Sequence, residues 1–197
     1  MSSPTTSLGV IERARKGDEE AFSWLFQRYA RRLAIYGHYH MSPEMRARLE
    51  VEDVLQEVFL RAFRDLGQFQ YQAAGAFYRW LLAIESNVLY DLARFQERQK
   101  RKAVEVVSFR SESNPAGFEP ADTATPSRWL ARKEECEQLF SRLEKLPEAY
   151  RQAIILTRVE GLTTEEMGQQ LGKDRKAAAL LLHRALKRFR ELVEESA

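Results

Sequence analysis

The side chains of this sequence that could recognise an unpaired base gather in one short stretch. Residues 67–75 read Gly-Gln-Phe-Gln-Tyr-Gln-Ala-Ala-Gly, so Gln68, Phe69 and Tyr71 lie close together between two helical patterns. Amides can hydrogen-bond the edge of an unstacked base and aromatic rings can stack on its face, which is how single-stranded nucleic acid is read. The other interpretation is a plain connector whose Phe69 and Tyr71 pack into the core.

A second group of candidate residues suits duplex DNA. Thr163 and Glu166 form a capping box for a short helix, Gly172 makes a turn, and Asp174 caps a long final helix. Two helices joined by a short glycine-containing turn are typical of a helix-turn-helix, in which the second helix meets base edges and basic residues meet phosphates. The candidate DNA contacts are Thr163, Thr164, Arg175, Lys176, Leu180, His183, Arg184 and Lys187. Three packed helices without a DNA role are the alternative.

A third candidate surface lies on a helix predicted over residues 51–66. Its apolar positions recur at helical spacing and predict a buried stripe of Val51, Leu55, Val58, Phe59, Ala62, Phe63 and Leu66. The opposite face carries Asp53, Gln56, Glu57 and Leu60. Carboxylates in the first turns suit the positive end of a helix dipole, so a solvated face explains them. That interpretation leaves Gln56 and Leu60 without a role, whereas a patch that docks a partner protein would use both.

Motifs of covalent chemistry and of metal binding are lacking. The sequence has no glycine-rich phosphate loop, no nucleophile elbow and no pair of histidines on one helical face. His38 and His40 lack acidic or cysteine partners at ligand spacing, and the single Cys136 rules out an internal disulfide. We therefore expect a protein that is not an enzyme and has no catalytic residue, metal, cofactor or small-molecule substrate.

Charge is segregated along the 197 residues, although the net charge is only +2. Residues 94–102 and 173–190 are basic apart from Glu97 and Asp174, while residues 50–57 are acidic. Such separation suits contacts with both nucleic acid and a second protein. The 30% of charged and 44% of hydrophobic residues are those of an ordinary globular protein. With no signal-like start and no apolar run of membrane length, the sequence predicts a cytoplasmic protein without membrane contact.

The helical patterns that carry these candidate residues predict an all-α fold. We expect two small helical domains joined by a flexible linker, and the C-terminal domain is a helix-turn-helix. The first domain comprises residues 1–103. Its first two helices are predicted from Thr6 or Ser7 to Lys16 and from a cap at Asp18 past Leu33, and a loop is predicted at 36–43. Two further helices are predicted over 51–66 and 76–101. Residues 104–126, rich in Ser, Pro, Asp and Thr, form the linker. The second domain, residues 127–197, opens with one helix from Ser127 to about Lys145 and another from Pro147 to about Glu160.

Three segments resemble bacterial RNA polymerase sigma factors, above all the extracytoplasmic-function (ECF) group of the sigma-70 family. Residues 53–63, Asp-Val-Leu-Gln-Glu-Val-Phe-Leu-Arg-Ala-Phe, resemble the helix of that family that binds core polymerase. Residues 77–91 resemble the helix that melts DNA and reads the minus-ten element. Residues 146–188, with Leu-Pro-Glu-Ala-Tyr-Arg-Gln-Ala and His-Arg-Ala-Leu-Lys-Arg, resemble the domain that reads the minus-thirty-five element. The resemblance implies a promoter-specificity subunit whose partners are core RNA polymerase, promoter DNA and, in some regulatory schemes, an anti-sigma factor.

The resemblance also assigns site residues. It gives polymerase binding to Asp53, Gln56, Glu57 and Leu60, and minus-ten recognition to Gln68, Phe69, Tyr71, Trp80, Asn87, Asp91, Arg94 and Arg98. Trp80 is either a wedge against DNA or a core residue. Two departures stand out: Glu85 puts a carboxylate where the family has a neutral or basic residue, and residues 177–181, Ala-Ala-Ala-Leu-Leu, replace a usual lysine or arginine. A free-standing helix-turn-helix regulator acting as a dimer is the alternative function, and it leaves the acidic helix without a role.

Overall fold

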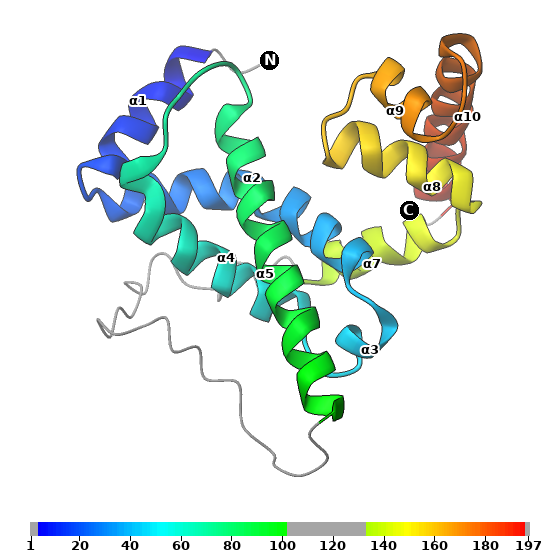
Figure 1. Cartoon of the computed structure of the whole chain (residues 1–197). Helices are drawn as coiled ribbons and strands as arrows, with labels where there is room; N and C mark the ends of the chain where they lie inside the picture. The colour runs from blue at the N-terminus through cyan, green and yellow to red at the C-terminus, as the bar shows by residue number, and fades with distance from the viewer. Residues whose placement is uncertain (1–3, 102–132, 196–197) are drawn as a thin grey trace.

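The computed structural model describes residues 4–101 and 133–195, and within these ranges the chain is helical with no strand. The first group of helices is α1 (Pro4–Arg15), α2 (Glu19–His40), α3 (Pro43–Arg46), α4 (Val51–Asp65), the 3-10 turn η1 (Leu66–Gln68) and α5 (Ala76–Arg101). The second is α7 (Lys133–Glu144), α8 (Glu148–Ile154), the π-helical turn η2 (Ile155–Val159), α9 (Thr164–Gln170) and α10 (Arg175–Glu194). Figure 1 shows them as two groups, which confirms the predicted fold class. The predicted linker and the predicted cap at Ser127 lie outside the described residues.

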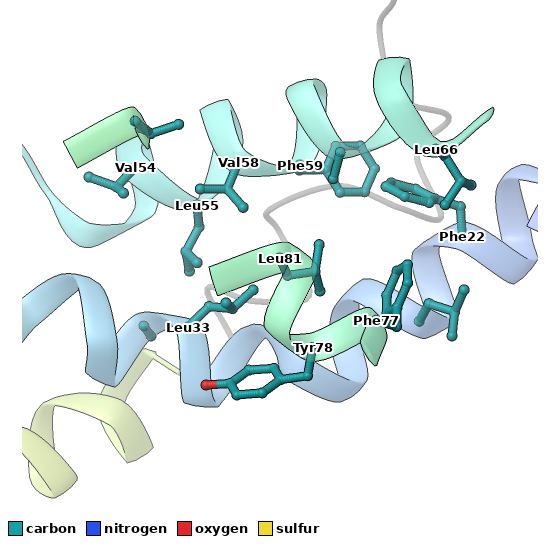
Figure 2. Close-up of a cluster of buried hydrophobic side chains, with 14 of the residues drawn as sticks. Phe22, Leu33, Val54, Leu55, Val58, Phe59, Leu66, Phe77, Tyr78 and Leu81 are labelled. Atoms are coloured by element: carbon teal, nitrogen blue, oxygen red, sulfur yellow. The ribbon is translucent and has the colours of Figure 1, made fainter. Parts of the chain in front are cut away.

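The first domain packs α1, α2, α4 and α5 around one apolar core. Asp18 starts α2, its Oδ1 accepting a hydrogen bond from the Ala21 N–H at 2.9 Å. The predicted stripe of α4 faces inward, and Phe59 and Phe63 meet Phe22 of α2 edge to face, with ring centroids 4.9 and 5.1 Å away. Figure 2 shows side chains of α2, α4 and α5 converging in this core. The core therefore fixes α4 and α5, the two helices that carry candidate site residues, relative to each other.

Helix α2 is longer than the sequence predicts. Residues 36–40 continue the helix, so the predicted loop at 36–43 was wrong over most of its length. Tyr, Gly and His are weak helix formers, but Tyr36 and Tyr39 pack against the core of the second domain. Burial of that kind stabilises a helix more than intrinsic propensity does. The break comes only at Ser42, which caps α3, with Pro43 in the first turn.

The second domain contains the predicted helix-turn-helix. The Thr163–Glu166 capping box is present, since the Thr163 N–H donates to Glu166 Oε2 at 2.7 Å and the Glu166 N–H to Thr163 Oγ1 at 3.2 Å. Gly172 makes the turn with φ 63°, and Asp174 caps α10 by accepting from the Ala177 N–H at 2.8 Å. The helix predicted from Pro147 forms as well, although its last five residues wind as the π-helical turn η2.

Gly168 allows α9 and α10 to cross closely. A Cβ added at Gly168 would lie 2.9 Å from the carbonyl oxygen of Lys173 and 3.0 Å from the Ala178 Cβ. We expect Gly168→Ala to lower the free energy of unfolding by about 1–3 kcal/mol, because backbone atoms would have to move. Urea denaturation followed by circular dichroism measures this loss. In the matched control Gly9→Ala in α1, no atom beyond the chain neighbours and the backbone of α1 itself lies within 4 Å of the new Cβ, so a gain in stability is expected there. Equal effects at the two sites would show that the close crossing is unimportant.

Candidate nucleic-acid and protein interfaces

The acidic face of α4 presents Asp53 and Gln56 to solvent. Both side chains are exposed, and Leu60, one turn further on, is half-buried against the core. Asp53 Oδ2 accepts a hydrogen bond from the Glu50 N–H at 2.9 Å, so this carboxylate caps the helix. A carboxylate has room for several donors, so the capping role and a docking role are compatible. These residues lie on a helix held rigidly by its buried stripe, as a docking surface requires.

Glu57 does not face solvent. It is 7% exposed, and its Oε1 accepts a hydrogen bond from Arg61 Nε at 2.7 Å. Arg61 Nη1 also donates to Asp91 Oδ2 of α5 at 2.8 Å, so one guanidinium joins two carboxylates on two helices. The prediction that Glu57 lies on the outward face was wrong, because α5 lies against α4. Glu57 is placed to hold α4 against α5, whereas Asp91 remains exposed at the edge of the network.

The aromatic residues of the 67–75 stretch turn inward. Phe69 is 4% exposed and meets Phe77 edge to face at 5.4 Å, with the Trp80 ring 5.2 Å away. As placed, Phe69 has no free face for a base, so its prediction as a DNA contact was wrong. Tyr71 and Trp80 are half-buried and pack on the same core, while Gln68 is exposed. Trp80 therefore packs on the core and keeps part of its surface accessible, while its role as a wedge against DNA stays a prediction.

The exposed face of α5 carries the remaining minus-ten candidates. Asn87, Asp91, Arg94 and Arg98 are exposed and follow one another at three- or four-residue spacing. Glu85 instead lies fully inside the domain, with Oε1 only 2.8 Å from where a Cβ on Gly37 of α2 would be. Burial raises the pKa of the Glu85 carboxyl well above its ordinary value and favours the neutral acid. Its carboxylate therefore cannot repel DNA from this surface.

The helix-turn-helix exposes its predicted contacts on α10. Arg175, Lys176, Leu180, His183, Arg184 and Lys187 are all exposed, and the Leu180 side chain is 49% accessible. Thr163 at the start of α9 is less suited to phosphate, while Thr164 beside it is half-buried. Both donors of Thr163, its N–H and Oγ1, point to Glu166 Oε2 at 2.7 and 2.8 Å. The Thr163 N–H bond lowers the pKa of Glu166, so an ionised carboxylate occupies the place of a phosphate.

Comparisons with known proteins agree with this geometry. The family model described as Sigma-70 region 2 matches residues 25–99, and the model described as Sigma-70, region 4 matches residues 136–189. The ECF RNA polymerase sigma-E factor of Escherichia coli strain K12 is 32% identical over 168 residues, which cover 85% of this chain and 83% of that protein. The chain belongs to the ECF RNA polymerase sigma factors. The RNA polymerase sigma factor CarQ of Myxococcus xanthus is similar too, at 31% identity over 94% of this chain and 96% of its own.

Among solved structures, the complex of CnrH with the cytosolic domain of CnrY is similar to this ECF sigma factor, with a TM-score of 0.42. That match has 24% identity and covers 95% of this chain and 97% of the other. Membership of the family defines the function: the chain is a transcription initiation factor that binds core RNA polymerase and promoter DNA. The alternative of a free-standing dimeric regulator is therefore not supported.

No helix in 4–101 or 133–195 is long and apolar enough to span a bilayer. In the same residues no group of three or more His, Cys, Asp or Glu side chains is arranged to hold a metal ion. Sequence reasoning missed Arg61 of α4, the residue that joins this helix to Asp91 of α5. Its signal was the acid–base pair Glu57 and Arg61 at i, i+4 spacing.

Proposed function

We propose that the two domains of this sigma factor divide its tasks. Residues 1–103 bind core polymerase and capture the melted minus-ten strand, residues 104–126 link the domains, and residues 127–197 read the minus-thirty-five element. The observation that supports this division most directly is the rigid junction of α4 and α5, where exposed acidic and amide groups on one helix lie beside an exposed polar and basic face on the other. The chain catalyses no covalent step in this proposal and acts in the cytoplasm.

Polymerase binding is assigned to Asp53, Gln56 and Leu60. Their side chains are accessible in whole or part and lie within about two helical turns of one another. Glu57 has a different role here: with Arg61 it orients α4 against α5 without touching polymerase. An acidic and apolar patch of this kind suits a basic partner surface with a small hydrophobic pocket.

Strand capture is assigned to Gln68, Tyr71 and Trp80 together with the α5 face of Asn87, Asp91, Arg94 and Arg98. Phe69 supports this surface from beneath, since its ring packs against Phe77 and Trp80. Each stacked base contributes about 1–3 kcal/mol, so two captured bases would offset the cost of local unstacking. Promoter opening is then driven only by the free energy of binding to the melted strand.

Run-off transcription tests the proposed function as a whole. A pool of genomic DNA fragments is transcribed by core RNA polymerase with and without the purified chain. We expect discrete transcripts that appear only when the chain is present, and the fragments that yield them define its promoters. Identical products in both reactions would overturn the proposal.

Recognition of duplex by α10 predicts a change in salt dependence. We expect Arg175→Ala with Lys176→Ala to weaken binding to a promoter fragment found by run-off transcription and to flatten the plot of log affinity against log salt. Each lost phosphate contact lowers the slope by about 0.9. Fluorescence anisotropy with the full chain between low and moderate salt measures this slope. Lys16→Ala with Arg48→Ala removes two exposed basic residues elsewhere and is the matched control. A slope equal to that of the unmodified chain would remove the two residues from the interface.

A further inference from the structure

The N-terminal half of α10 is apolar. Residues 177–182 read Ala-Ala-Ala-Leu-Leu-Leu, so no side chain between Lys176 and His183 can donate or accept a hydrogen bond. In a helix-turn-helix this part of the second helix is the one that meets base edges. The side chains of this segment therefore cannot read bases by hydrogen bonds, and only apolar contacts are open to them.

The three leucines of this segment have different surroundings. Leu181 and Leu182 pack against the core of the second domain, to which the buried Ala178 and Ala185 also belong. Leu180 is 49% exposed, because helical spacing turns it to the face opposite those alanines. Of the three leucines, Leu180 is thus the one that a partner of α10 can reach.

Leu180 lies in the middle of a basic face. Lys176 precedes it by one helical turn, Arg184 follows it by one turn, and both are exposed. At a rise of 1.5 Å per residue, each of these cations is about 6 Å from Leu180 along the axis, which is less than two base-pair steps of about 3.4 Å. A single exposed leucine is common on protein surfaces. A leucine between two phosphate-binding cations, however, faces the groove that lies between those phosphates.

The neighbours of Leu180 leave it room to reach a base, and the start of α10 is fixed. Ala177 and Ala179 are exposed and end at Cβ, so Leu180 projects beyond both. Asp174 accepts a hydrogen bond from the Ala177 N–H at 2.8 Å, and the Lys173 N–H donates to the carbonyl oxygen of Gly168 in α9 at 2.8 Å. Figure 1 shows α9 and α10 beside each other. The position of Leu180 relative to α9 is therefore set before DNA binds, which lowers the entropic cost of a contact.

The base edges in the major groove offer one apolar group, the C5 methyl of thymine. We propose that Leu180 is a specificity-determining residue that recognises the C5 methyl of a thymine in the minus-thirty-five element, while Lys176 and Arg184 bind phosphates on either side. The inference rests on the proposed function, in which α10 reads duplex DNA, and it names the chemical group that is read. Leu180 then favours thymine over cytosine, which lacks the methyl group, without any hydrogen bond to the base.

Deoxyuridine tests the methyl contact, because it differs from thymidine only in lacking the C5 methyl group. Each thymidine in either strand of the minus-thirty-five element is replaced singly in a promoter fragment found by run-off transcription. The affinity of core polymerase carrying the full chain is measured for each fragment by competition binding. We expect deoxyuridine to weaken binding by about three- to tenfold at one position at least, the effect of losing one buried methyl contact.

Leu180→Ala assigns the effect to one side chain. This variant should bind the thymidine and deoxyuridine fragments equally at the sensitive position, because the leucine half of the contact is gone. Alanine is the better helix former and Leu180 is half exposed, so α10 stays folded. The matched control Leu8→Ala removes a leucine of α1 that is 38% exposed, and it should keep the full difference between the two fragments.

Three results would overturn the methyl contact: an element with no thymine in either strand, equal affinity for thymidine and deoxyuridine at every position, or a deoxyuridine effect that persists undiminished in Leu180→Ala. The absence of any chain-dependent transcript would instead overturn the proposed function. In that case the full chain without polymerase is bound to two random duplex pools, one made with thymidine and one with deoxyuridine. Preferential retention of the thymidine pool, lost in Leu180→Ala, supports the methyl contact, and equal retention of the two pools overturns it.

Discussion

Replacing Asp53 and Gln56 together with alanine is expected to abolish detectable binding to core RNA polymerase, a loss of at least about 100-fold in affinity, or about 2.7 kcal/mol. Both side chains are exposed on a rigid helix, and their removal deletes the charge and the amide that the docking patch offers. The loss of the Asp53 cap costs only about 0.5–2 kcal/mol of helix stability, so the domain stays folded. A pull-down on immobilised core polymerase, with circular dichroism to check folding, measures the effect.

The control for this variant comes from α7. Glu135→Ala with Gln138→Ala removes an exposed acid and an exposed amide at the same three-residue spacing and changes the net charge equally. We expect this control to bind polymerase like the unmodified chain. Retention of the Asp53 and Gln56 double variant at the level of the control would show that α4 docks through other residues or does not dock.

The sequence predicted the helices that begin at a local capping residue. It missed the helical residues 36–40, which depend on contacts with the other domain. Asp18, Asp174 and the pair Thr163 and Glu166 each start a helix where predicted, because a cap acts on its own first turn. Residues 36–40 have no such signal. Their helix exists because their aromatic and imidazole side chains meet α7 and the end of η2, contacts more than 100 residues away along the chain.

Sequence patterns also failed to predict which side chains of the candidate site are buried by neighbouring helices. Helical spacing placed Asp53 and Gln56 outward correctly, but it put Glu57 outward too, since spacing alone does not reveal that α5 covers one edge of α4. Phe69 was assigned to DNA by its type and its place in a loop. The aromatic residues Phe77 and Trp80 one helix later provide an apolar surface that buries it. Long-range packing between neighbouring elements decided both cases.

Glu85 is one of the two departures from the family pattern, and it should make the free energy of unfolding depend on pH. The structure explains how a carboxyl fits there: Gly37 of α2 leaves the space that the side chain fills. The pKa of this carboxyl in the folded chain is raised well above its ordinary value of 4.5 by burial. The folded state therefore holds the proton more tightly than the unfolded state does. Below about pH 4.5 both states are protonated and nothing is lost, whereas stability falls as the pH rises from there towards the folded pKa.

We expect Glu85→Gln, which stays neutral, to remove this pH-dependent loss. The difference in unfolding free energy between the variant and the unmodified chain should be small near pH 4 and should grow in favour of the variant towards pH 8, by about 1.4 kcal/mol for each unit by which the folded pKa is raised. Urea denaturation at several pH values measures the difference. Glu97→Gln makes the same substitution at an exposed position of α5 and shows the effect of losing a carboxyl that is not buried. A difference that stays constant from pH 4 to pH 8 would mean that Glu85 is ionised in the folded chain, and that its carboxylate has found a route to water or to a cation.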